Sequence, residues 1–184
     1  MYIGIDFEGS GIFDGFPESP VQLGMLKMNK DIELIIKTYL KRQKPISKWA
    51  YKIHKISSDK CANAPELHNL WFLFKDLTHF NNIWVGHNVG TEKKFLNSAF
   101  PLANFKKMKW IDTLRLSRFA FPGLSCHSLE DVCEFLNLKP EISKIISGDW
   151  HDAAFDACAS LVLLRKLKTL PGWSLISDEK LMQI

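Results

Sequence analysis

The order of strand-like and helix-like patterns along the chain limits its fold more than any other feature. The expected strands are residues 2–7, 21–28, 31–40, 83–85 and 108–111. Along the first of them, Ile3, Ile5 and Phe7 share one face, whereas Asp6 and Glu8 share the other. Strands that come first as hairpins and then alternate with helices are typical of an α/β protein. The sequence therefore predicts a five-stranded sheet of mixed direction that is flanked by helices.

Apolar residues at helical spacing predict the segments that cover this sheet. The expected helices are residues 45–56, 64–80, 90–100, 112–121, 128–136 and 152–168. No repeat, low-complexity stretch or long Pro/Gly linker divides the chain, so we expect one domain over residues 1–170. Residues 171–184 form a polar tail, which we expect to be a surface extension.

The composition is that of an ordinary globular protein, with 46% hydrophobic and 24% charged residues. No apolar run is long enough to span a membrane, and the first residues lack the features of a signal peptide. The four cysteines form no C-x-x-C pair and show no metal-finger spacing. We therefore expect a cytoplasmic protein without a membrane partner, whose thiols are reduced and mostly buried.

The net charge of +4 permits nucleic acid as a partner but does not require it. Lysines cluster at residues 41–44, 93–94 and 106–109. Each cluster, taken alone, is better explained as a solvated face of the protein. The sequence gives no information on protein partners.

Carboxylates and one histidine gather in three separate segments. Asp6 and Glu8 lie on the first strand, Glu92 follows the fourth strand, and His151 and Asp156 flank the start of the last long helix. The carboxyl ends of the first and fourth strands should lie side by side, and ligand sites of open α/β sheets gather at that edge. Metal-assisted cleavage of a phosphodiester needs oxygen ligands for Mg²⁺ and a base for water.

Each of these signals also has a purely structural explanation. A lone D-x-E is usually a solvated strand face. Asn88 is a good N-cap for the next helix, and we expect capping to be its main role. Glu92 falls in the first turn of that helix, where it is either a partner of the helix dipole or a metal ligand.

The spacing of His151 and Asp156 constrains where the histidine lies. Five helical residues rotate by roughly 500°, so two mid-helix side chains at this spacing would diverge by about 140°. His151 can share a site with Asp156 only if it lies at or before the helix start. The histidines assigned to ordinary surface positions are His54, His68, His79 and His127.

Together the three segments resemble the motifs of the DEDDh family of 3′–5′ exonucleases. Asp6-Phe7-Glu8 is similar to the first motif, residues 85–96 to the second and residues 151–157 to the third. The resemblance covers roughly residues 1 to 168. Two motifs depart from the family pattern. The second motif normally has an aromatic residue followed by an aspartate, where this chain has Thr91 and Glu92. In the first motif, Gly9 replaces the threonine that usually follows the glutamate.

The resemblance implies a ribonuclease-H-like fold, an exonuclease domain over residues 1–170 and two divalent metal ions, Mg²⁺ or Mn²⁺. It implies that Asp6, Glu8 and Asp156 hold the catalytic metal, that Asp6 also touches the second metal, and that Glu92 supplies the fourth carboxylate. His151 would be the general base that deprotonates the attacking water.

Substrate contacts are expected near the end of the first strand and of the fourth. The candidate substrate-binding residues are Gly9, Ser10, Phe13, Phe16 and Asn88. Gly9 lets a substrate approach the backbone closely. Phe13 and Phe16 either stack on terminal bases or pack under their loop, and the sequence does not decide between these roles.

These expectations lead to one function and two alternatives. We expect a metal-dependent 3′–5′ exonuclease that acts on single-stranded DNA or RNA and releases nucleoside 5′-monophosphates. The first alternative is a catalytically impaired nucleic-acid-binding domain of the same fold, which would bind but not shorten a strand. The second is an interaction domain that merely retains the fold, and it predicts no stabilisation by metal.

Overall fold

The computed structural model describes residues 1–12 and 17–184 of the chain. The strands are β1 (Tyr2–Gly9), β2 (Pro20–Met28), β3 (Ile32–Tyr39), β4 (Ile83–Gly86) and β5 (Lys109–Asp112). They form one five-stranded sheet in the order β3-β2-β1-β4-β5. β1 pairs antiparallel with β2 and parallel with β4. The predicted mixed sheet and the predicted contact between the first and fourth strands are therefore confirmed.

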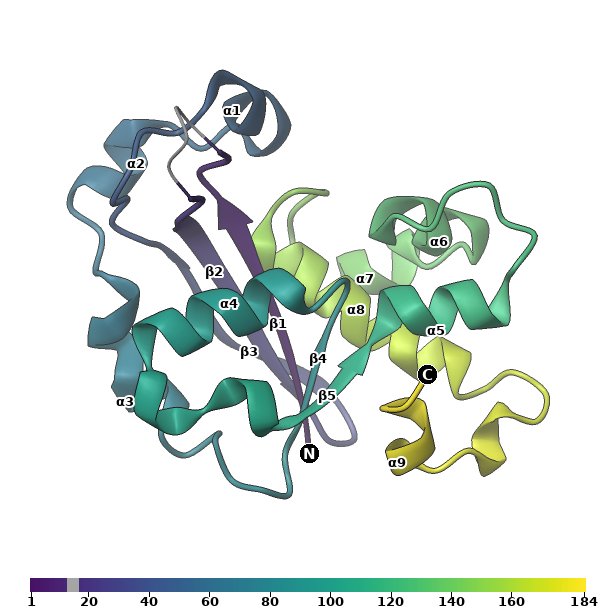
Figure 1. Cartoon of the computed structure of the whole chain (residues 1–184). Coiled ribbons are helices and arrows are strands. Elements are labelled where there is room, and N and C mark those ends of the chain that lie inside the picture. Colours follow the sequence, from purple (N-terminus) through teal and green to yellow (C-terminus); the bar gives the residue numbers. More distant parts are fainter. Residues whose placement is uncertain (13–16) are drawn as a thin grey trace.

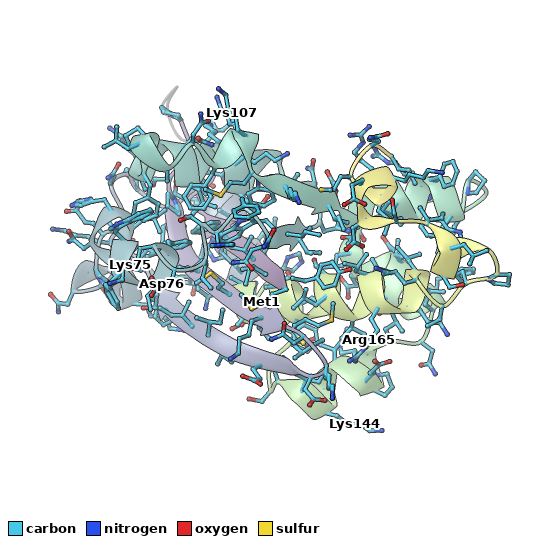
Figure 2. The ribbon with its side chains drawn as sticks, turned by 90° about the horizontal axis from the view of Figure 1, so that it is seen from below. Met1, Lys75, Asp76, Lys107, Lys144 and Arg165 are labelled. Atoms are coloured by element: carbon cyan, nitrogen blue, oxygen red, sulfur yellow. The ribbon has the colours of Figure 1, made fainter. Side chains whose placement is uncertain are left out.

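Helices cover both faces of this sheet (Figure 1). The α-helices are α1 (Lys48–His54), α2 (Ser58–Ala62), α3 (Trp71–Phe74), α4 (Gly90–Ala99), α5 (Thr113–Ala120), α6 (Leu129–Phe135), α7 (Lys139–Ile145), α8 (Ala153–Leu167) and α9 (Asp178–Leu181). The 3-10 helices are η1 (Leu67–Leu70), η2 (Pro101–Ala103), η3 (Phe105–Lys107) and η4 (Trp173–Leu175). Charged side chains reach the periphery on both sides of the sheet, as Lys107 and Lys144 show in Figure 2.

Two large hydrophobic cores lie against the sheet, and a third, small cluster contains Val21, Ile56 and Cys61. One core contains Ile3, Ile5 and Phe7 and packs against α3 and α4, as the alternation along β1 predicts. The other core is built around α8, which contributes buried residues along its whole length. Within the described residues, no helix is both long and apolar enough to cross a membrane.

Helix α8 approaches the sheet closely because glycines face it. A Cβ added at Gly24 would lie 2.2 Å from the carbonyl carbon of Ala153, and one added at Gly4 would lie 2.6 Å from Cγ of Leu161. Real Cβ atoms do not make such contacts, so any side chain at these positions would push the helix away. Close packing of α8 brings its first turn to the end of β1.

The helix predicted over residues 64–80 is much shorter in the structure. The segment begins as η1, continues as α3 and ends at Phe74. The apolar spacing correctly identified Leu67, Leu70 and Phe74 as buried. The chain then turns, with the Asn82 amide nitrogen donating to the Leu77 carbonyl at 3.0 Å, because it must enter β4.

The last residues pack onto the molecule, so the prediction that residues 171–184 are a surface extension is wrong. Leu181 is 1% exposed and belongs to the core around α8. The Tyr2 hydroxyl donates to Asp178 at 2.8 Å, and the Lys168 ammonium donates to the same carboxylate. Apolar residues among the polar ones of this segment, and contacts with β1 and α8, hold it in place. The division of the chain at residue 170 stays a prediction.

Candidate active site

The first two carboxylates lie at the carboxyl end of β1, where this strand continues beyond its parallel neighbour. β1 pairs with β4 only from Tyr2 to Gly4, whereas Asp6 and Glu8 pair with β2 alone. Asp6 is half-buried, and Glu8 is 9% exposed. Since β4 ends below them, the space beside these side chains is left for the first turns of α4 and α8.

The start of α8 is fixed on β2 and β3. The side-chain oxygen of Gln22 accepts a hydrogen bond from the Ala153 backbone at 2.9 Å. Asp152 caps the helix and forms an ion pair of 2.6 Å with Lys37. These contacts place Asp156, one turn into α8, against the end of β1.

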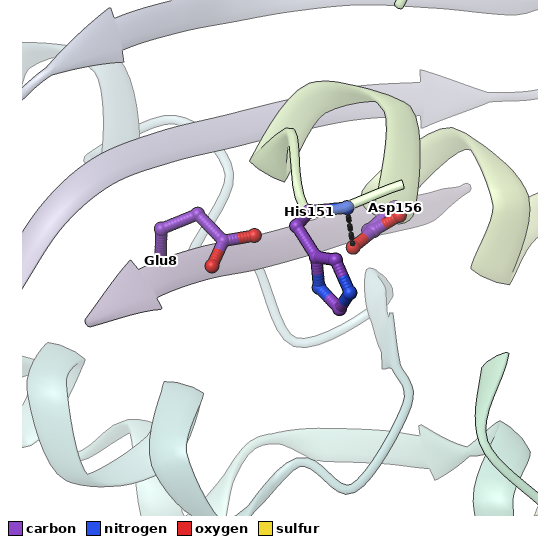
Figure 3. Close-up of side chains that lie close together, drawn as sticks. All are labelled: Glu8, His151 and Asp156. Atoms are coloured by element: carbon purple, nitrogen blue, oxygen red, sulfur yellow. Dashed lines mark hydrogen bonds between the residues drawn. The ribbon is translucent and has the colours of Figure 1, made fainter. Parts of the chain in front are cut away.

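His151 lies immediately before the cap of α8, as its spacing from Asp156 requires. It is exposed and has a positive φ of 63°, and its backbone N–H donates to Oδ2 of Asp156 at 3.2 Å. Glu8, His151 and Asp156 each offer a ligand atom, and these atoms all lie within 4.8 Å of one another (Figure 3). The structure thus joins residues that are far apart in the sequence into one cluster.

Glu92 approaches the same edge from α4. It is 4% exposed, and Oε2 of Glu92 has no hydrogen-bond partner among the described residues. Asp6 and Glu92 lie outside the cluster of three, but Asp6 raises the pKa of Glu8, Glu92 and Asp156 through charge repulsion. The four predicted carboxylates are therefore close enough to interact.

The turn before α4 is held by a side chain from β5. Oδ1 of Asp112 accepts from the Asn88 backbone at 2.8 Å, and Oδ2 of Asp112 accepts from the Val89 backbone at 3.3 Å. Val89 occupies the N-cap position, and Asn88 adopts a left-handed conformation with a φ of 70°. The prediction that Asn88 caps the helix is wrong, because a carboxylate from a neighbouring strand satisfies these N–H groups.

Burial and mutual repulsion make the metal-free carboxylates harder to ionise than free acids. Burial, followed by repulsion from nearby carboxylates, raises the pKa of Asp6 to about 7, of Glu8 to about 8 and of Asp156 to about 9. Burial and the charge of Asp6 also raise the pKa of Glu92 well above its usual value. Ionising all four of these buried acids together is costly without a cation.

The side chains fit divalent metal ions. Oε2 of Glu92 and Oδ1 of Asp156 are buried without a hydrogen-bond partner in the described part of the chain. A buried carboxylate oxygen of this kind needs either a proton or a cation. Carboxylate oxygens are the ligands that Mg²⁺ prefers, and Mn²⁺ accepts the same ligands.

A pocket of about 210 Å³ opens beside the carboxylates, between α1 and the start of α4. Its lining residues are Phe7, Glu8, Gly9, Glu18, Trp49, Ala50, Ile53, His54, His87, Asn88, Thr91 and Glu92. A larger pocket of about 470 Å³ adjoins it at Glu18 but contains none of the four predicted carboxylates. The smaller pocket is therefore the candidate site for a substrate.

The structure brings some of the predicted substrate-binding residues to the pocket but not all of them. Gly9 and Asn88 line the pocket. Ser10 is fully buried and its hydroxyl accepts from the Ser19 backbone at 3.0 Å, so its side chain is not brought to the pocket. Phe13 and Phe16 lie outside the described residues.

Glu18 lies against Gly9, the position where the family pattern has threonine. A Cβ added at Gly9 would lie 2.1 Å from Oε1 of Glu18, so the glutamate fills the space of a side chain at that position. The same oxygen accepts from the Gly11 backbone at 3.1 Å. Glu18 thus occupies space beside Gly9 although it lies nine residues later in the chain. The sequence around Gly9 does not indicate this contact.

His54 was expected at the surface but is 9% exposed and lines the pocket. Its Nδ1 accepts from the Ile56 backbone at 2.9 Å, so Nε2, 3.1 Å from the Gly9 carbonyl, carries the proton in the neutral ring. Burial lowers the pKa of this imidazole. The prediction that His54 lies at an ordinary surface position is therefore wrong.

A 3-2-1-4-5 sheet that brings carboxylates and a histidine to the end of its first strand defines a ribonuclease-H-like nuclease. The family model described as Exonuclease matches residues 3–164. The chain belongs to this family, the DEDDh family of 3′–5′ exonucleases.

Known relatives agree with this membership. The "DNA polymerase III PolC-type" of Bacillus cereus is 27% identical over 170 residues, which are 90% of this chain and 11% of that protein. The chain thus spans about a tenth of the length of the first PolC-type relatives. These relatives give no support to an impaired binding domain.

Solved structures share the fold. Exonuclease X in complex with 5′ overhanging duplex DNA has a TM-score of 0.74 at 20% identity and covers 100% of this chain and 98% of its own. The nuclease domain of 3′hExo, a DEDDh family member bound to rAMP, has a TM-score of 0.63 at 17% identity, with coverage of 95% and 94%.

Proposed function

We propose that this chain removes nucleotides one at a time from the 3′ end of single-stranded DNA or RNA and releases nucleoside 5′-monophosphates. The observation that carries the proposal is the convergence of Glu8, His151 and Asp156 within 4.8 Å at the end of β1. Membership of the DEDDh family supports the polarity of the reaction.

Asp6, Glu8, Glu92 and Asp156 would hold two divalent ions, Mg²⁺ or Mn²⁺. Such ions, when bound, neutralise the charge of the reacting phosphate and lower the pKa of a water molecule. Binding of a cation would favour the deprotonated carboxylates, and the charge of the cation would offset their mutual repulsion.

His151 would accept the proton of the attacking water. It is exposed, so water reaches its ring, and the hydrogen bond from its backbone to Asp156 keeps it beside the carboxylates. A base positioned in this way is typical of general acid–base catalysis. The pocket lined by Gly9 and Asn88 would hold the terminal nucleotide.

We propose that the exonuclease unit comprises residues 1–170 and that residues 171–184 support it from outside the site. Asp178 supports this arrangement, because it bonds to Tyr2 and Lys168 rather than to any of the four carboxylates.

The test is incubation of 5′-labelled single-stranded DNA and RNA of matched sequence with Mg²⁺, with Mn²⁺ or with EDTA. We expect a ladder of shortened strands with metal and none with EDTA, and the comparison of the two strands identifies the substrate. Asp156→Asn, which keeps the size of the side chain, should abolish the ladder. A folded protein that binds the strand without shortening it with either metal would refute the proposal in favour of an impaired binding domain.

A further inference from the structure

The larger of the two pockets that meet at Glu18 is not used by the proposed reaction. It has a volume of about 470 Å³ and lies between residues 17–20, the segment after β3 and helix α4. Lys41, Lys44 and Lys94 line it, and we call it the lysine pocket. None of the described residues that line it is one of the four carboxylates or the catalytic histidine.

The lysine pocket joins two lysine clusters that are far apart in the sequence. Lys41 and Lys44 follow β3, whereas Lys94 lies in α4. Ser98 lies one turn after Lys94 on the same face of the helix and also lines the pocket. Lys94 is exposed and makes no ion pair with any residue that the structure describes. Each cluster alone is explained as a solvated face, but the fold brings both to the wall of one cavity.

One wall of the lysine pocket is held in place by contacts within the protein. The Lys41 backbone donates to the Pro65 carbonyl at 2.9 Å, and the Lys41 ammonium lies 3.5 Å from Oε1 of Glu66. Oε2 of Glu66 lies 3.4 Å from Nδ1 of His68, which also lines the pocket. Glu66 therefore offsets the charge of Lys41, whereas the charge of Lys94 stays available to a ligand.

The lysine pocket also has an apolar wall. Leu40, Leu67 and Phe95 line it with buried side chains. Gln43 and Ser98 add polar groups that can donate and accept hydrogen bonds. An apolar lining with a few polar groups and a charged residue is typical of a small-molecule site, and the volume lies in the usual range of roughly 300–1,000 Å³.

We propose that the lysine pocket binds a free nucleoside 5′-monophosphate. The phosphate contacts Lys94, and the flat base lies against the apolar wall. A phosphate monoester carries a charge of about −1.5 to −2 at pH 7, whereas each phosphodiester linkage of a strand carries a single charge. The monoester therefore gains more from the lysines than a linkage of a strand does.

The charge at the junction of the two pockets also favours a free nucleotide over a continuous strand. Glu18 lines both pockets, so a strand that ran from one to the other would bring its phosphates past this carboxylate, which repels them. A free nucleotide has no phosphate that must pass this point. Binding of this kind goes beyond the proposed function, because it requires no cleavage of a strand.

The test is an NMR titration of the metal-free, ¹⁵N-labelled protein in EDTA. We expect 5′-AMP to shift the amide signals of Lys41, Gln43 and Ser98 until the site is saturated, and adenosine, which lacks the phosphate, to bind far more weakly. Lys94→Gln should weaken binding of 5′-AMP by about tenfold, the usual effect of losing one hydrogen bond to a charged group. Lys107→Gln is the matched control, because Lys107 is also exposed (Figure 2) but lies outside the lysine pocket.

Several outcomes would overturn the inference. Equal affinities of wild type and Lys94→Gln for 5′-AMP would exclude a phosphate contact at Lys94. Shifts confined to Gly9 and Asn88 would place the nucleotide in the smaller pocket instead. Inorganic phosphate that binds as tightly as 5′-AMP would show a site for phosphate alone. Tighter binding of a single-stranded oligonucleotide without a terminal phosphate, at the same amides, would show a strand path.

The ladder assay keeps this inference separate from the proposed function. A ladder from a protein that does not bind 5′-AMP in the lysine pocket would contradict the inference alone. Binding of 5′-AMP in this pocket by a protein that forms no ladder with either metal would contradict the proposed function alone.

Discussion

His151 is the residue whose removal separates catalysis from structure most cleanly. Its side chain is exposed, and the hydrogen bond to Asp156 comes from its backbone, so His151→Ala should leave the melting temperature almost unchanged. The rate should fall by roughly 10²–10⁴-fold, the usual contribution of a positioned base. Single-turnover rates measured across the pH range check this. His79→Ala is the control, since His79 is exposed and stacks on Phe80 away from the pocket. Near-full activity of His151→Ala at every pH would contradict the assignment.

Glu92 is the position where the chain departs from the carboxylate pattern of its family. Its extra methylene displaces the carboxylate, and Mg²⁺ tolerates little departure from octahedral geometry at about 2.0–2.1 Å. We expect higher activity with Mn²⁺ than with Mg²⁺, and a smaller difference for Glu92→Asp. Initial rates with each metal, at matched protein stability, measure the ratio.

Two results would change the interpretation of Glu92. Identical activities of wild type and Glu92→Ala with both metals would make Glu92 a partner of the helix dipole rather than a ligand. Activity in Glu92→Asp but not in wild type would favour the catalytically impaired domain.

The sequence predicted the catalytic candidates better than their surroundings. The spacing of His151 and Asp156 indicated that the histidine precedes the helix, because two side chains five residues apart within a helix point in different directions. The structure places His151 before the helix. The roles of Glu18 and Asp112 could not be predicted in this way. Each acts on backbone groups of another segment, and such contacts exist only after the chain has folded.

At the scale of elements, the packing of α8 on the sheet positions the site. Gly24→Ala would place a methyl group against the backbone of Ala153. We expect a loss of about 1–3 kcal/mol in the free energy of unfolding, the usual cost of overpacking, and weaker metal binding because Asp156 moves with the helix. Urea denaturation and calorimetric metal titration measure these effects. Gly123→Ala is the control, because a Cβ there meets nothing within 4 Å. Equal stabilities of the two variants would contradict the close packing.

The strands were easier to predict than the short helices. The alternation along β1, the tight turn between β2 and β3 and the apolar runs of β4 and β5 are local signals, and all five strands lie where the sequence predicts them. α2, α7 and α9 were missed because each of them buries a single residue, which is too few to show a helical period. α3 was predicted too long because the apolar spacing continues through a turn that the path to β4 imposes.

At the scale of the whole molecule, the buried acids make stability depend on pH. The pKa values of Glu8 and Asp156 are raised to about 8 and about 9 in the folded chain, above those of an unfolded chain. The folded protein therefore holds protons that the unfolded chain has released, and this contribution to stability is lost as the pH rises through these values. The melting temperature of the metal-free protein should fall between pH 7 and pH 9, where melting curves are to be compared. Burial lowers the pKa values of the His54 and His87 imidazoles, so at lower pH the unfolded chain binds more protons at these residues than the folded chain does. These two groups therefore reduce stability as the pH falls.

Metal should reverse this trend. Mn²⁺ binds the deprotonated carboxylates, so it should raise the melting temperature more at pH 9 than at pH 7. Asp156→Asn removes one titrating group and should flatten the metal-free curve. A melting temperature that is independent of both pH and Mn²⁺ would favour an interaction domain without a metal site.

The carboxylates and His151 at the end of β1 should hydrolyse a single-stranded nucleic acid from its 3′ terminus. A strand labelled on its 3′-terminal nucleotide tests this most directly, under single-turnover conditions with Mn²⁺. The account predicts that the first labelled product is the nucleoside 5′-monophosphate, formed by wild type and not by Asp156→Asn. Labelled oligonucleotides as first products, or no labelled product from a folded, metal-bound wild type, would contradict it.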